Sequence, residues 1–114
     1  MLRVMADASS LERRRASRIP VAIAVELRDE HGFSLHSSSD ISDGGAFFDR
    51  AIPHKVGHRL TVSFTLPGDR RPIVCEGEVV NVPDANEYGM GVRFLLMGDE
   101  DRRRLVAFIQ QMGG

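Results

Sequence analysis

Residues 60–66 read Leu60-Thr61-Val62-Ser63-Phe64-Thr65-Leu66, with apolar and hydroxyl side chains in strict alternation. Successive side chains of an extended chain point to opposite faces, so this period of two predicts a β-strand with one buried face. No other stretch of the chain gives as clean a signal. This strand indicates a protein built on a β-sheet.

Five more strands are expected around it, because short alternating apolar runs are separated by residues typical of turns. They cover residues 21–27, 33–41 (interrupted by the serine run 37–39), 46–48, 73–82 and 88–94. After Gly98 the apolar spacing becomes that of a helix, which predicts a helix over about residues 99–112. We expect an all-β fold with a terminal helix: a six-stranded antiparallel β-barrel, since closure removes exposed strand edges.

The length of 114 residues fits one domain. Cys75 is the only cysteine, which excludes an internal disulfide and fits a reducing compartment. No apolar run approaches the roughly 20 residues that a membrane helix needs. Since the first 20 residues also lack the apolar stretch of a secretory signal, a cytoplasmic protein without membrane insertion is expected.

The net charge of −1 is unevenly distributed. Residues 1–19 hold five arginines against two acidic residues, whereas residues 20–114 are mildly acidic. We expect residues 1–19 to be a flexible basic arm and residues 20–114 to be the folded domain. An acidic body argues against DNA or RNA as the partner, because nucleic-acid binders are usually basic across a whole face.

The arm carries Arg14-Arg15-Ala16-Ser17-Arg18, an R-x-x-x-R pattern directly preceded by Arg13. Arg14 and Arg18 are four residues apart, so they share a face in a helical turn and in an extended segment alike. Guanidinium groups donate paired hydrogen bonds to phosphates and to guanine O6 and N7. The alternative for this motif taken alone is a solvated basic tail.

The second motif is Asp40-Ile41-Ser42-Asp43-Gly44-Gly45, which reads D-x-S-x-x-G. Asp40 can accept the N1–H and N2–H groups of guanine, and Ser42 can reach a phosphate or hold a turn. Gly45, helped by Gly44, would allow a positive φ and bring backbone N–H groups to a ligand. A turn without a ligand is the alternative. Together the two motifs indicate a guanine nucleotide with more than one phosphate.

With the strand between them, these motifs resemble the PilZ family, bacterial receptors for the second messenger cyclic di-GMP. The resemblance covers nearly the whole chain, and Gly89-Met90-Gly91-Val92-Arg93-Phe94 is similar to a strand common in that family. The resemblance implies a ligand site in two parts. The arm would contribute Arg14 and Arg18; the barrel would contribute Asp40, Ser42 and Gly45, with Gly44 and Arg93 as further candidates. Arg93 is expected on the outer face, where a surface arginine is favoured over a ligand contact.

The resemblance also assigns a role to Arg13. An arginine directly before R-x-x-x-R goes with an intercalated pair of cyclic di-GMP molecules in this family. An extra cation offsets the four negative charges of such a pair, so we expect two ligand molecules rather than one. No other cofactor is expected.

The sequence has to be assigned to a binding module, an enzyme or a protein adaptor. A binding module is favoured over an enzyme, because the sequence shows no catalytic set of residues. The alternative is a PilZ-like adaptor that binds another protein without a nucleotide, in pilus, flagellar or motility control. His54 and His58 have the i, i+4 spacing of metal ligands, but no third ligand is evident and no metal is expected. We expect the ligand to order the arm and create a surface for a downstream protein, the chain being a monomer or a weak dimer.

Overall fold

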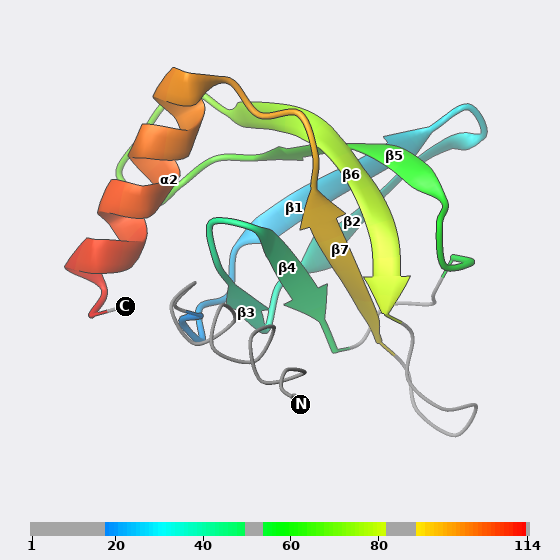
Figure 1. The fold of residues 1–114 in the computed structure, drawn as a ribbon, viewed down its shortest axis with the longest axis horizontal. Coiled ribbons are helices and arrows are strands. Elements are labelled where there is room, and N and C mark those ends of the chain that lie inside the picture. Colours follow the sequence, from blue (N-terminus) through cyan, green and yellow to red (C-terminus); the bar gives the residue numbers. More distant parts are fainter. Residues whose placement is uncertain (1–17, 50–53, 82–88, 114) are drawn as a thin grey trace, which may run out of the picture.

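The computed structural model describes residues 18–49, 54–81 and 89–113, which form a curled β-sheet and one helix (Figure 1). The elements are β1 (Ala24–Asp29), β2 (Gly32–Ser37), β3 (Asp40–Ile41), β4 (Gly45–Phe48), β5 (Arg59–Phe64), β6 (Ile73–Asn81), β7 (Met90–Phe94) and α2 (Asp99–Gln111). The expected fold class, antiparallel β-structure followed by a terminal helix, is confirmed. Val82 and Tyr88, expected in the fifth and sixth strands, lie outside the described residues.

In the part of the chain that the structure describes, the sheet has seven strands, where the sequence predicted six. The expected strand 33–41 is two strands, β2 and β3, because the serines between them bond in different directions. The Ser38 hydroxyl donates to the Val21 carbonyl (2.7 Å) and accepts from the Ile23 N–H (3.0 Å). The Ser39 N–H donates to the Phe47 carbonyl (2.8 Å). The chain therefore leaves β1 at Ser38 and joins β4 one residue later.

The strand order is β2-β1-β5-β6-β7-β4-β3, and every neighbouring pair is antiparallel. β2 and β3 lie at the two ends of this order, yet only Ser38 and Ser39 separate them in sequence. The sheet must curl to bring its ends together, and Figure 1 shows the resulting half-barrel. Closure comes from the connecting chain, since no ladder pairs β2 with β3 in the described residues.

The inner face of the curled sheet holds the apolar core. Leu60, Val62 and Phe64 of β5 are buried as the alternation predicted, at 4%, 0% and 3% exposure. Cys75 of β6 is also buried, and this burial raises the pKa of its thiol to about 11. Burial of a Leu, Val or Phe side chain contributes about 1.5–3 kcal/mol to the stability of the fold. Alternating apolar residues along a few strands therefore suffice to make the sheet curl around its core.

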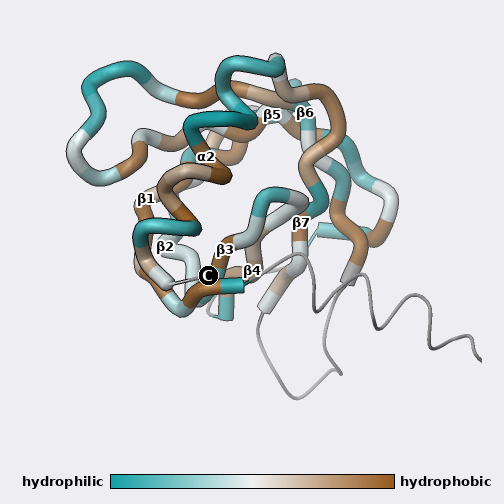
Figure 2. The backbone as a smooth tube through the Cα atoms, turned by 60° about the vertical axis from the view of Figure 1, so that its left-hand side comes forward, coloured by the Kyte–Doolittle hydropathy of each residue, from teal (hydrophilic) through white to brown (hydrophobic). Residues whose placement is uncertain are grey.

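Helix α2 adds one amphipathic face to the same core. Hydrophilic and hydrophobic residues follow one another within its turns (Figure 2), and Leu105, Phe108 and Ile109 are buried. Acidic residues fill its first turn, where they oppose the positive end of the helix dipole. Arg102 Nη1 donates to the Asp43 carbonyl at 3.0 Å, which ties the helix to the turn between β3 and β4. No helix in the described ranges has the length and apolarity that crossing a bilayer requires.

Candidate functional site

The turn between β3 and β4 is built by the D-x-S-x-x-G motif. The Ser42 N–H donates to the Gly45 carbonyl at 2.8 Å, and the Ser42 hydroxyl accepts from the Gly44 N–H at 3.1 Å. The same hydroxyl lies 3.4 Å from the Gly45 carbonyl oxygen, to which it donates. Ser42 is 4% exposed, so its side chain holds the turn from within.

Gly45 is required by packing and not by its backbone angles. A Cβ at this position would lie 2.4 Å from the Val92 carbonyl oxygen and 3.2 Å from Arg93 Cα. The positive φ expected for Gly45 and Gly44 is therefore wrong; in the described residues positive φ occurs at other glycines. The lack of a side chain at Gly45 lets β4 and β7 approach each other. Gly44, by contrast, is exposed, and a Cβ there would meet only Ser42 Oγ at 3.9 Å.

Arg18 is held beside Asp40 by a short piece of backbone pairing. Ile19 and Ile41 exchange backbone hydrogen bonds of 3.0 and 3.1 Å, and both side chains are buried. This bridge places the residues next to them together, and Arg18 Nη1 lies 2.5 Å from Asp40 Oδ1. Ile19, which falls within the predicted arm, is thus an anchor in the core. Arg13 and Arg14 lie outside the described residues.

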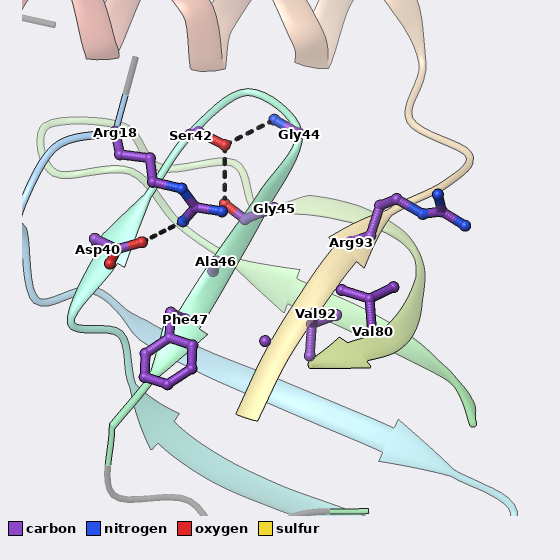
Figure 3. A pocket seen from close by; sticks show the side chains of 11 residues that line it. Arg18, Asp40, Ser42, Gly44, Gly45, Ala46, Phe47, Val80, Val92 and Arg93 are labelled. Atoms are coloured by element: carbon purple, nitrogen blue, oxygen red, sulfur yellow. Dashed lines mark hydrogen bonds and ion pairs between the residues drawn. The ribbon is translucent and has the colours of Figure 1, made fainter. Parts of the chain in front are cut away.

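A cavity of about 480 Å³ opens above this pair. Of the residues predicted from the sequence, those that line it are Arg18, Asp40, Ser42, Gly44, Gly45 and Arg93. Figure 3 shows Arg18 turned toward Asp40 and Arg93 extending from β7 on the other side. Arg93 reaches this position because it pairs with Gly45 in the β4–β7 ladder. The volume is within the range of small-molecule sites, about 300–1,000 Å³.

Both arginines at the cavity are paired with carboxylates. Arg93 Nη2 lies 2.6 Å from Glu78 Oε1, and its side chain is 59% exposed, as expected for an outward-facing residue. Arg18 is 49% exposed. Exposed ion pairs contribute about 0–1 kcal/mol, so either guanidinium can exchange its carboxylate for an anionic ligand at little cost. The site thus combines two guanidinium groups that can change partners, those of Arg18 and Arg93, with a hydrogen-bond acceptor, the Asp40 carboxylate of β3.

This cavity also has an apolar wall that was not predicted from the sequence. Phe47 of β4 and Val80 of β6 line it, and Val80 is 43% exposed although its neighbour Val79 is fully buried. The register between β6 and β7 shifts between Val79 and Asn81, which is a β-bulge beside the site. Alternation in the sequence gives no sign of this bulge, because only pairing with β7 defines it.

A second cluster of polar side chains lies where β1 ends, at Asp29. The Asp29 carboxylate, His54 and His58 bring their ligand atoms within 4.8 Å of one another. The sequence showed the two histidines but no third ligand; folding supplies Asp29 from a strand 29 residues away from His58. Hydrogen bonds from His58 and from the His31 N–H lower the pKa of the Asp29 carboxylate. Burial, together with nearby His54, lowers the pKa of His36 in the same region.

Comparison with known proteins places the fold and its motifs in one family. The family model described as PilZ domain matches residues 12–111, which include both motifs, all strands and the helix. The chain belongs to the PilZ domain family. A search of curated protein sequences found no match.

Several solved structures have the same fold as this domain at low sequence identity. The inhibitor of motility MotI/DgrA of Bacillus subtilis aligns with a TM-score of 0.73 and 20% identity, covering 84% of this chain and 49% of that one. The PilZ domain of YcgR from Escherichia coli, solved with c-di-GMP, aligns with a TM-score of 0.67 and 18% identity, covering 89% of this chain and 92% of that one. The K. pneumonia MrkH–c-di-GMP complex aligns with a TM-score of 0.71 and 22% identity, covering 88% of this chain and 52% of that one. This PilZ domain thus spans about half the length of MotI/DgrA and MrkH.

Proposed function

We propose that this PilZ domain is a receptor for cyclic di-GMP and not an enzyme. The observation that carries the proposal is the single cavity shared by Arg18, Asp40 and the Ser42–Gly45 turn. These are the residues at which the family's nucleotide motifs fall. The similarity to the PilZ domain of YcgR and to MrkH, both solved with c-di-GMP, also supports the proposal.

The proposed roles follow from the geometry. Asp40, 32% exposed, accepts the N1–H and N2–H groups of a guanine, which adenine does not offer as a pair. Arg18 leaves Asp40 and donates to a phosphate or to guanine O6 and N7. Ser42 and Gly45 keep the turn in shape, Gly44 borders the ligand with exposed backbone, and Arg93 provides a cation from β7. Arg14 completes the site from the arm.

We further propose two ligand molecules per domain. Two stacked molecules carry four negative charges at close range, and Arg13 adds a third guanidinium to those of Arg14 and Arg18. Isothermal titration calorimetry measures the stoichiometry directly. The expected value is two for the native chain and one for Arg13→Ala; a native value of one would exclude the stacked pair.

Ligand binding is proposed to order the arginine arm across the barrel and so present a new surface to a partner protein. Repulsion among the arginines opposes this arrangement until a polyanion neutralises them. Amide hydrogen exchange of residues 1–17, with and without cyclic di-GMP, tests the step. We expect protection only with the ligand, and equal exchange in both states would exclude it.

A nucleotide-independent adaptor is the second candidate, favoured by the likeness to the motility inhibitor MotI/DgrA over 84% of this chain. One titration separates the two functions. Cyclic di-GMP is expected to bind, whereas GTP and cyclic di-AMP at the same concentrations are expected not to. Failure of all three to bind would favour the adaptor.

A further inference from the structure

Another cavity, of about 630 Å³, lies beside the hairpin of β1 and β2. It shares no lining residue with the cavity at Arg18 and Asp40. The chain has four histidines, and all of them line this cavity: His31, His36, His54 and His58. Asp29 is on the same wall. Imidazole nitrogens are thus concentrated at one place by folding.

Three of these side chains approach one another closely. His58 Nε2 lies 3.0 Å from Asp29 Oδ2, and the rings of His54 and His58 are stacked with centroids 4.8 Å apart. The side chains are half-buried: Asp29 is 14% exposed and His58 33%. Among the described residues the ring of His54 makes no hydrogen bond and only stacks on His58. The Asp29–His58 hydrogen bond therefore accounts for the positions of these two side chains but not for that of His54.

The backbone around the cluster holds these side chains in place. Asp29 Oδ1 accepts the His31 N–H at 2.8 Å, which turns the other carboxylate oxygen toward His58. The segment before β5 is fixed to β6, because Gly57 donates to the Val79 carbonyl at 2.7 Å and Val79 donates to the His58 carbonyl at 3.0 Å. Gly57 has a φ of 93°, which a residue with a side chain rarely adopts. Two rigid supports thus face each other across the β1–β5 ladder.

We propose that Asp29, His54 and His58 form a binding site for a divalent ion of the zinc class. Two imidazoles and one carboxylate are ligands typical of Zn²⁺ with one position left for water. Ligand atoms around tetrahedral Zn²⁺ lie about 3.3 Å apart, because the bonds are about 2.0–2.1 Å long. The three ligand atoms lie within 4.8 Å of one another, so they need to approach by at most about 1.5 Å to surround the ion. Mg²⁺ and Ca²⁺, which prefer oxygen ligands, fit this set poorly.

The test uses the full-length chain without an affinity tag, stripped of metal, and titrated with Zn²⁺ against a chromophoric chelator. We expect one Zn²⁺ per chain, and no binding of Mg²⁺ or Ca²⁺ at the same concentrations. His58→Gln and Asp29→Asn are each expected to weaken Zn²⁺ binding at least about tenfold. The matched control is His31→Gln, because His31 lines the same cavity outside the cluster, and its affinity should equal that of the native chain.

A second measurement serves if the variants fail to fold. In the native chain, NMR spectra of the histidine side chains should show Zn²⁺-dependent shifts of the His54 and His58 ring nitrogens, with His31 unchanged. Absence of Zn²⁺ binding would overturn the proposal. So would equal loss of affinity in His31→Gln and His58→Gln, or a shift confined to other histidines.

Discussion

The cavity at Arg18 and Asp40 and the cavity at the histidines differ in how the chain assembles them. At the first, Asp40, Ser42 and Gly45 come from one continuous motif, and Arg18 is brought to Asp40 by a single backbone bridge. At the second, Asp29 meets His54 and His58 only because β1 pairs with β5. The first site can be recognised from residue spacing. The second exists only in the folded sheet.

The cavities also differ in charge. Arg18 and Arg93 border the first, with the arm's further arginines preceding Arg18 in sequence, which suits an anion. Imidazole side chains and a carboxylate border the second, which suits a cation. The two proposed ligands therefore have opposite charges, and we expect the two sites to bind them separately. The following experiments test that separation.

The largest effect is expected for Arg18→Ala. Loss of one guanidinium should weaken cyclic di-GMP binding at least about 100-fold, since charge-assisted contacts of this kind are worth about 2–5 kcal/mol. The melting temperature should hardly change, because the Arg18–Asp40 pair is exposed. Calorimetry and thermal unfolding measure the two quantities. Arg71→Ala is the control: Arg71 forms a similar exposed pair with Glu100 at 2.9 Å, away from the cavity. Equal binding by both variants would contradict the assigned site.

Gly45→Ala should destabilise the fold by about 1–3 kcal/mol, because the new Cβ would overlap the backbone of β7. Gly44→Ala is the matched control one residue away, and its free energy of unfolding should stay within about 0.5 kcal/mol of the native value. Urea denaturation measures both. A larger effect at Gly44 than at Gly45 would show that the turn, and not the close approach of β7, requires glycine.

The buried thiol of Cys75 reports on the apolar core that underlies both cavities, because it makes the stability of the fold depend on pH. Its thiol has a pKa of about 11 in the fold and 9.0 when free. The unfolded chain therefore loses its thiol proton first as the pH rises, and the folded state becomes less stable between these two values. The decrease should be about 1 kcal/mol from pH 9 to pH 10.

The control for this measurement is Cys75→Ala, which keeps every other titrating group. The difference in unfolding free energy between the two chains isolates the thiol. An unchanged difference across this range of pH would mean that water reaches Cys75 in the native state.

The smallest expected effect is the coupling between the cavities. Since they share no lining residue, saturation with Zn²⁺ should change the affinity for cyclic di-GMP less than about twofold. Calorimetry with and without Zn²⁺ measures the coupling, with His58→Gln as the reference. A larger change that His58→Gln abolishes would show that the sheet transmits the ion's effect to the nucleotide site.

The strands and the helix could be predicted because their signals are local. Leu60, Val62 and Phe64 declare their face by alternation, and Leu105, Phe108 and Ile109 do so by helical spacing. The serine run indicated an interruption of the second strand, but not that the chain changes its pairing partner there. Ser38 bonds to Val21 and Ile23, whereas Ser39 bonds to Phe47, and these partners meet only in the folded sheet. The same holds for Val80, whose exposure follows from a bulge against β7.

The family, the class of fold and the two motifs can be recognised in the sequence, because each depends on residues near one another in the chain. The need for glycine at position 45, and the place of Arg93 at the same cavity as Arg18, become visible only in the folded sheet. The folded sheet alone also brings Asp29 to His54 and His58. The physical reason is common to all three. Each depends on the register of one strand against another, and register is set by the burial of the whole sheet and not by local residue preference.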